Sequence, residues 1–80
     1  RIPMSKERIR QTIEGLEIAA EIEGVIADHY ANLLNEDIGS LNEMDRRRVR
    51  EALSAKSNRR RIEDEANLWR FALAALEDKT

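Results

Sequence analysis

The chain of 80 residues contains no cysteine, and this absence excludes both a disulfide framework and a thiolate metal site. It also has only one proline and three glycines, the residues that most often interrupt helices and form turns. With 38% charged residues, the composition is typical of a helix-rich protein of one domain. We therefore expect a single helical domain over residues 1–80.

Long apolar runs are missing as well. No stretch approaches the roughly 18 residues that cross a bilayer, and the N-terminal segment has no apolar signal-peptide core. We expect no membrane partner and no secretion, and a cytoplasmic location is the default for a chain without cysteine.

Residues that could serve catalysis or bind metals are scarce. His29 is the single histidine, and Ile26 stands where a di-iron bundle would place a glutamate. Glu14, Glu17 and Glu21 share one helical face, but no ligand-dense loop accompanies them, so we interpret them as a solvated ridge. None of the serines has a base beside it in the sequence. We expect a non-enzymatic protein with no catalytic residues, no cofactor, no metal site and no small-molecule substrate.

Hydrophobic periodicity predicts an all-α fold, a small three-helix bundle in which one long helix precedes a helix-turn-helix pair. The first helix is expected over about residues 6–35, with Ser5 as its N-cap. The second covers about residues 41–54 and begins with the capping box Ser40-Leu41-Asn42-Glu43. The third covers about residues 58–78.

The break between the second and third helices is predicted from the angular positions that apolar residues would take around one continuous helix. Leu53 and Ile62 are nine residues apart, which is about half a turn out of phase in one continuous helix. A turn within residues 54–58 would place both side chains on the core side. Ser54, Ser57 and Asn58 are suitable caps for a new helix there.

The first and third helices carry more apolar surface than one core can bury. The first has a core stripe of Ile9, Ile13, Leu16, Ala20, Ala27 and Leu34. The third has one of Ile62, Ala66, Trp69, Leu73 and Leu76. Further side chains lie away from both stripes, and they predict a dimer or partner interface formed by Ile18, Ile22, Val25, His29, Leu33, Leu68, Phe71 and Ala75.

A basic block covers residues 46–61. It holds seven arginines and one lysine against a single acid, a local charge of +7, while the whole chain has a net charge of −2. The candidate contacts for an anion or a nucleic acid are Arg46, Arg47, Arg48, Arg50, Lys56, Arg59, Arg60 and Arg61.

The competing interpretation of the block is a set of ion pairs within the helices. Carboxylates four residues away predict the pairs Glu43 to Arg47, Arg47 to Glu51, Arg59 to Glu63, Arg60 to Asp64 and Arg61 to Glu65. Such pairs would neutralise the half of the block near residue 60. Any anionic partner is therefore expected to contact the half near residue 48.

Two short stretches resemble the end of the inhibitory motif in antitoxins of Fic-type AMP-transferases. That motif has a serine or threonine, three further residues, and then a glutamate followed by glycine or asparagine. The stretches are Glu14-Gly15 and Glu23-Gly24, with Arg10 and Ala19 at the positions of the hydroxyl residue. The resemblance implies an antitoxin or inhibitor whose glutamate meets an arginine of its target.

Three hypotheses of function follow. The first, which we favour, is a non-enzymatic protein interaction or regulatory module that forms a homodimer or binds another protein. The second is a small nucleic-acid-binding protein that uses the basic block, and the third is an antitoxin or inhibitor.

Overall fold

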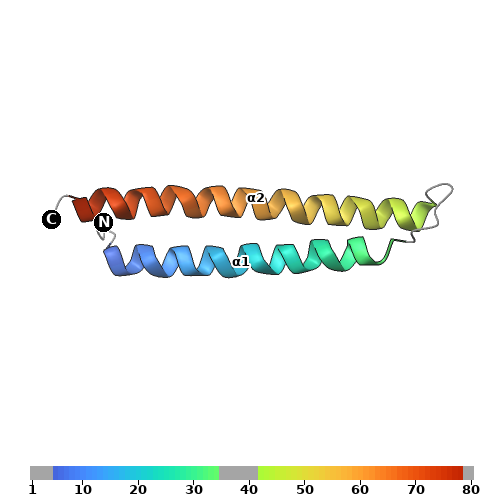
Figure 1. The fold of residues 1–80 in the computed structure, drawn as a ribbon, viewed down its shortest axis with the longest axis horizontal. Coiled ribbons are helices and arrows are strands. Elements are labelled where there is room, and N and C mark those ends of the chain that lie inside the picture. The colour runs from blue at the N-terminus through green and yellow to red at the C-terminus, as the bar shows by residue number, and fades with distance from the viewer. Residues whose placement is uncertain (1–4, 35–41, 79–80) are drawn as a thin grey trace.

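The structure, a computed structural model, describes residues 5–34 and 42–78. They form two α-helices, α1 (Lys6–Asn32) and α2 (Glu43–Asp78), which lie side by side in opposite directions (Figure 1). The resulting rod measures 61 × 21 × 17 Å. We call the end near Ser5 and Asp78 the terminal end, and the end near Leu34 and Asn42 the connecting end.

The all-helical prediction is confirmed, but the prediction of three helices is wrong. α2 continues without interruption through residues 54–58, where a turn was expected. The phase argument failed because it assumed that Leu53 faces the core. In the structure Leu53 is 61% exposed, and its neighbours Ala52 and Ala55 are buried instead. Ala55 and Ile62 are two turns apart, so one continuous helix keeps both on the same side.

The core-facing positions of both helices alternate in steps of three and four residues. In α1 they are Ile9, Ile13, Leu16, Ala20, Glu23, Ala27 and Tyr30, and in α2 they are Asp45, Arg48, Ala52, Ala55, Arg59, Ile62, Ala66, Trp69, Leu73 and Leu76. All of them except Arg59 are buried or half-buried. This is the heptad spacing of a coiled coil, and we letter the positions a to g, with a and d toward the partner helix. Ile13 and Asp45 are a positions.

Two ion pairs define the register of the hairpin. The Arg10 guanidinium lies 3.0 Å from the Glu77 carboxylate, and Arg70 pairs with Glu17. All four residues occupy e positions, and the two residue numbers add up to 87 in both pairs. Residue n of α1 therefore lies opposite residue 87 − n of α2. The four side chains are about half exposed, so each pair contributes at most about 1 kcal/mol.

The helix N-termini have side-chain caps. Ser5 Oγ accepts a hydrogen bond from the backbone N–H of Arg8 at 3.1 Å, as the sequence predicts. Before α2, the side-chain oxygen of Asn42 accepts from the backbone N–H of Asp45 at 2.8 Å. The predicted capping box depends on Ser40, which lies outside the described residues.

Large and small apolar residues are distributed in an unusual way. The buried apolar residues are Ile9, Ile13, Ala20, Ala27, Ala52, Ala55 and Ala66, and five of these seven are alanine. The large apolar side chains that stay exposed are Ile18, Ile22, Val25, Ile26, Leu33, Met44, Leu53, Leu68 and Phe71. Alanines make up most of the buried apolar residues and bring the two helices together, while nine large apolar side chains of the described residues stay exposed.

Candidate interaction surfaces

The eight residues predicted to form an interface are all exposed, with Leu68 at 66% and Phe71 at 77%. The structure does not gather all eight on one surface. Because the e positions of both helices meet on one side of the hairpin, the g positions meet on the opposite side. We call that side, with the c positions that border it, the apolar side. Toward the terminal end and along α1 it carries Ala19, Ile22, Ile26, His29 and Leu33 of α1 and Leu68, Ala72 and Ala75 of α2. Its other g and c positions include Thr12, Gly15, Arg47, Glu51, Ser54, Asn58, Arg61 and Glu65.

The register places the two halves of the apolar side next to each other. Residue 68 of α2 lies opposite residue 19 of α1, so Leu68 and Ile22, which are 66% and 55% exposed, lie less than one helical turn apart along the rod. The g positions beside them hold the half-buried Ala19 and Ala72 and the exposed Glu65. Toward the connecting end Ile26 and Leu33 occupy the g positions of α1, so the middle of the apolar side is low only toward the terminal end.

The remaining predicted interface residues point elsewhere. Ile18, Val25 and Phe71 occupy f positions, which face away from the partner helix. Val25 borders a groove on the e side of the hairpin rather than the apolar side. His29 is exposed and makes an edge-to-face ring contact with Tyr30, with the ring centroids 5.4 Å apart.

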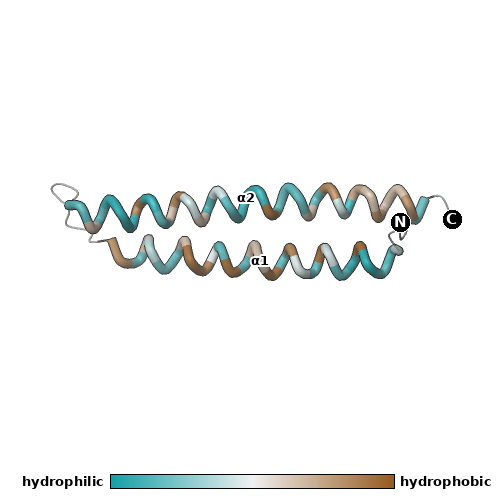
Figure 2. Tube along the Cα trace, turned by 180° about the vertical axis from the view of Figure 1, so that it is seen from behind, coloured by the Kyte–Doolittle hydropathy of each residue, from teal (hydrophilic) through white to brown (hydrophobic). Residues whose placement is uncertain are grey.

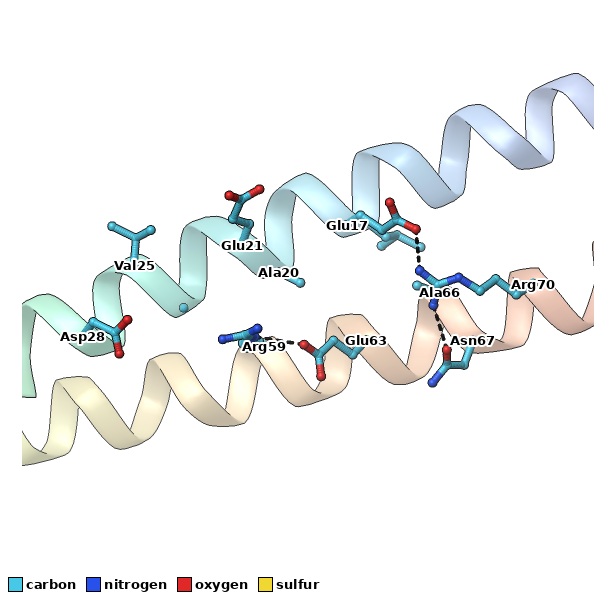
Figure 3. A pocket seen from close by; sticks show the side chains of 12 residues that line it. Glu17, Ala20, Glu21, Val25, Asp28, Arg59, Glu63, Ala66, Asn67 and Arg70 are labelled. Carbon is cyan, nitrogen blue, oxygen red and sulfur yellow. Dashed lines mark hydrogen bonds and ion pairs between the residues drawn. The ribbon is translucent and has the colours of Figure 1, made fainter.

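The groove on the e side is polar, with a floor of small residues (Figure 3). It has a volume of about 470 Å³, and Ala20, Gly24 and Ala66 lie among its lining residues. In Figure 3, Arg70 extends toward Glu17 on α1, while Glu21 and Val25 point away from α2. Two of its acids pair with its two arginines, Glu17 with Arg70 across the helices and Glu63 with Arg59 along α2.

Gly24 explains how one arginine fits at a core position. A Cβ atom on Gly24 would lie only 2.6 Å from Arg59 Nη1, so the missing side chain leaves room for the guanidinium against α1. Arg59 also pairs with Glu63 at 2.9 Å, which confirms one of the predicted ion pairs. Arg59 is one of the candidate anion contacts, and the structure places its side chain beside Gly24 with 51% of it exposed. Gly15, by contrast, has open space around its Cβ position.

Arg48 also serves the hairpin. Its guanidinium donates to the backbone carbonyl oxygen of Leu33 at 2.9 Å and lies 3.6 Å from the buried Asp45 carboxylate. A cation at this place satisfies a carbonyl group at the end of α1. Arg48 therefore holds the connecting end of the hairpin together, a role that the sequence did not reveal.

The remaining predicted ion pairs do not form among the residues that the structure describes. Arg61 donates to the Asn58 side chain at 3.1 Å, and Glu65 accepts from Trp69 Nε1 at 3.3 Å. Glu43 lies 3.6 Å from Arg50 rather than beside Arg47. Arg46, Arg47, Lys56 and Arg60 have no ion pair within the described ranges.

Five arginines of the block share the outward face of α2. They occupy b, c and f positions, and this face carries no acid between residues 46 and 61. Figure 2 shows the same half of α2 as predominantly hydrophilic, while the half toward Asp78 is more hydrophobic. We call the five the cationic stripe: Arg46, Arg47, Arg50, Arg60 and Arg61. Lys56, at an e position, lies toward α1 and outside the stripe.

Other kinds of site find little support in the structure. Within residues 5–34 and 42–78, no three histidine or acidic side chains are grouped to hold a metal ion. The described helices include none that is both long and apolar enough to cross a membrane. Comparison with protein-family models, with curated proteins and with solved structures gives no match. Function must therefore be argued from the surfaces themselves.

Proposed function

We propose that this chain is a non-enzymatic protein interaction module that forms a homodimer through its apolar side. The observation that carries this proposal is the set of large apolar side chains, among them Ile22, Leu68 and Phe71, that stay exposed outside the core of the hairpin. A hairpin of two helices has no second layer to cover these side chains. Association with another helical surface supplies that layer.

The exposed area is large enough for a stable dimer. Ile22, Ile26, Leu33 and Leu68 lie on the apolar side, with Ile18 and Phe71 at its borders. The exposed fractions of the four residues on the apolar side, between 36% and 66%, correspond to about 370 Å² of apolar surface per protomer. Ile18 and Phe71, at the f positions next to its c positions, bring the total to about 600 Å². A standard interface buries about 800 Å² on each partner, so these side chains would provide most of one. At about 25 cal/mol per Å², their burial favours association by more than 10 kcal/mol per protomer before the entropic cost of association.

A second copy of the chain fits this surface. Two hairpins facing each other would form a four-helix bundle, in which Ile22 and Leu68 of one copy pack against the apolar side of the other. Ala19 and Ala72 at g positions and Ala75 at a c position allow close approach of the helices toward the terminal end. The same residues on both copies satisfy the self-complementarity that a two-fold interface requires.

Size-exclusion chromatography with light scattering tests the proposal. At tens of micromolar, the wild-type chain should have twice the mass of one chain, about 18 kDa against a protomer mass of 9.2 kDa. Ile22→Glu and Leu68→Glu should each convert it to a monomer, because either change places a charge in the apolar side. A wild-type chain that remains monomeric at this concentration would refute the homodimer.

Leu53 provides a matched control. It is a leucine on α2 with 61% exposure, close to the 66% of Leu68, but it occupies a b position outside the apolar side. Leu53→Glu should leave the dimer intact. If Leu53→Glu disrupts association as strongly as Leu68→Glu, the interface has been assigned to the wrong face.

A further inference from the structure

The cationic stripe exists because α2 is one continuous helix. Residues 46 and 61 are fifteen positions apart, or about 22 Å along the helix axis. Arg46, Arg47 and Arg50 form one group near the connecting end, and Arg60 and Arg61 form a second group on the same outward face. A break within residues 54–58 would have separated the two groups onto different helices.

The guanidinium groups of the stripe have few partners in the hairpin. Arg46, Arg47 and Arg60 make no ion pair with any described residue, and Arg61 donates only to the Asn58 amide oxygen. Arg50 lies 3.6 Å from Glu43, but the two side chains are 67% and 82% exposed, and such a pair contributes little. Five like charges on one face repel each other and lower the stability of the isolated helix. The hairpin gains no visible stability from this arrangement, which suggests an anionic partner.

We propose that the cationic stripe binds the phosphate backbone of a nucleic acid. Guanidinium groups match phosphate oxygens in bidentate geometry, and all five cations of the stripe are arginine rather than lysine. Ser54 and Ser57 are exposed on the same face between the two arginine groups, and serine hydroxyls are frequent phosphate contacts. One strand of a duplex presents a phosphate about every 3.4 Å, or about six along the length of the stripe.

Two other anionic partners fit the stripe less well. A helix that lies on a membrane surface needs an apolar face beside its basic face. In this segment Ala52 and Ala55 are buried against α1, and the exposed Met44 and Leu53 are isolated from each other, nine residues apart, so they form no such face. An acidic protein surface would need a comparably dense row of unpaired carboxylates. On a second copy of this chain, the outward b positions of α1 present Glu7, Glu14, Glu21 and Asp28, one carboxylate every seven residues, and Glu7 already lies 3.8 Å from Arg10.

A binding titration at several salt concentrations tests the proposal. The probes are a fluorescent 20-base-pair DNA duplex of mixed sequence and a duplex of unrelated sequence, and the readout is fluorescence anisotropy. With five phosphate contacts, log K should fall against log salt with a slope of about −4.5, and both duplexes should bind equally. The affinity should lie in the range of about 10⁻⁴ to 10⁻⁶ M that is usual for contacts to the backbone alone.

Matched double substitutions locate the contact. Arg60→Gln with Arg61→Gln should reduce the slope by about 2 units, and the control pair Lys6→Gln with Arg8→Gln should leave it unchanged. Both pairs remove two positive charges from a helix, but Lys6 and Arg8 belong to the terminal end of α1. Circular dichroism should show native helicity for both variants, since the stripe residues are exposed.

Three results would overturn the proposal. The first is no binding at 100 μM protein in 50 mM salt, and the second is an equal loss of slope in the control pair. The third is binding to vesicles of anionic lipid without binding to either duplex. The test is independent of the homodimer, because Leu68→Glu lies outside the stripe and its monomer should retain the salt-dependent binding. A failure of dimerisation and a failure of nucleic-acid binding are therefore separate outcomes.

Discussion

The continuity of α2 can be tested with one proline. Ser57 lies within the segment where the sequence predicts a turn, and in the structure it is an exposed residue in the interior of α2. If a new helix began there, proline at its first turn would be tolerated. In a continuous helix, Ser57→Pro removes the hydrogen bond from residue 57 to the carbonyl of residue 53, and the ring collides with that carbonyl group.

The expected cost follows from the position of the residue. Because Ser57 is exposed and its hydroxyl makes no hydrogen bond in the described part of the chain, its replacement loses little packing, and the cost comes mainly from the backbone. That effect is about 3 kcal/mol or more. For a domain of this size the total free energy of unfolding is only about 4 to 12 kcal/mol, so the variant should be strongly destabilised.

Urea unfolding followed by circular dichroism measures the effect at one fixed protein concentration, because dimerisation makes stability depend on concentration. Lys6→Pro is the control. Lys6 is the first residue of α1, and Ser5 before it has an extended backbone, with φ −81° and ψ 157°, which suits a residue that precedes proline. Ser57→Gly, at about 1 kcal/mol, gives an intermediate point if the proline variant does not fold. Equal stability of Ser57→Pro and Lys6→Pro would refute the continuous helix.

Two further predictions concern side chains that hold the hairpin together. Arg48→Gln should lower the free energy of unfolding by about 1 to 2 kcal/mol, because it leaves the buried Asp45 without its cation, whereas Arg47→Gln should change it by less than about 0.5 kcal/mol. Equal effects in urea unfolding would contradict the structural role of Arg48. Gly15→Ala should stabilise α1 by about 0.5 to 1 kcal/mol. Gly24→Ala should stabilise it less, because the added Cβ would lie 2.6 Å from Arg59 Nη1 and the guanidinium would have to move. In an Arg59→Ala background the two glycine substitutions should become equivalent, and a difference that persists there would show that Arg59 is not its cause.

The sequence predicts the apolar stripes well where large residues form them. In α1, Ile9, Ile13, Ala20 and Ala27 are buried as expected, and Ala66 is buried in the distal half of α2. These stripes repeat with a clear helical period, so burial can be inferred from spacing alone. The exposure of the second set, from Ile18 to Phe71, could also be predicted because those residues lie out of phase with the core.

The prediction failed where the core is not hydrophobic. Between residues 45 and 59 the core-facing positions of α2 hold Asp45, Arg48, Ala52, Ala55 and Arg59, which give no apolar stripe to follow. Leu53 is the largest apolar residue nearby, and placing it toward the core predicts the wrong core-facing side for this part of α2. The polar residues can face the core because their partners come from elsewhere in space: Arg48 contacts a carbonyl of α1, and Arg59 lies against Gly24. Neither partner can be identified from the local sequence.

The structure distinguishes the two stretches that resemble the antitoxin motif. Of the two Glu-Gly stretches, Glu23-Gly24 is accounted for by the fold, since the glycine makes room for Arg59 and Glu23 is half-buried at a core position. Glu14-Gly15 is exposed and has free space beside it. An inhibitory contact through such a motif would therefore have to use Glu14, and Glu14→Gln would be the variant that tests it.

The continuity of α2 connects the two proposed surfaces. Residues 43–61 have eight basic and three acidic side chains, a net charge of +5, and residues 62–78 have one basic and five acidic side chains, a net charge of −4. One helix thus carries a basic half toward the connecting end and an acidic half, with the exposed Leu68 and Phe71, toward the terminal end. An anionic nucleic acid is attracted to the first half and repelled by the second, while an apolar interface forms more readily where the arginines are absent. Arg47 and Arg61 occupy c positions at the border of the apolar side, but Arg46, Arg50 and Arg60 at b and f positions stay accessible in a dimer that forms through it. Each protomer would therefore present its own arginines to a nucleic acid.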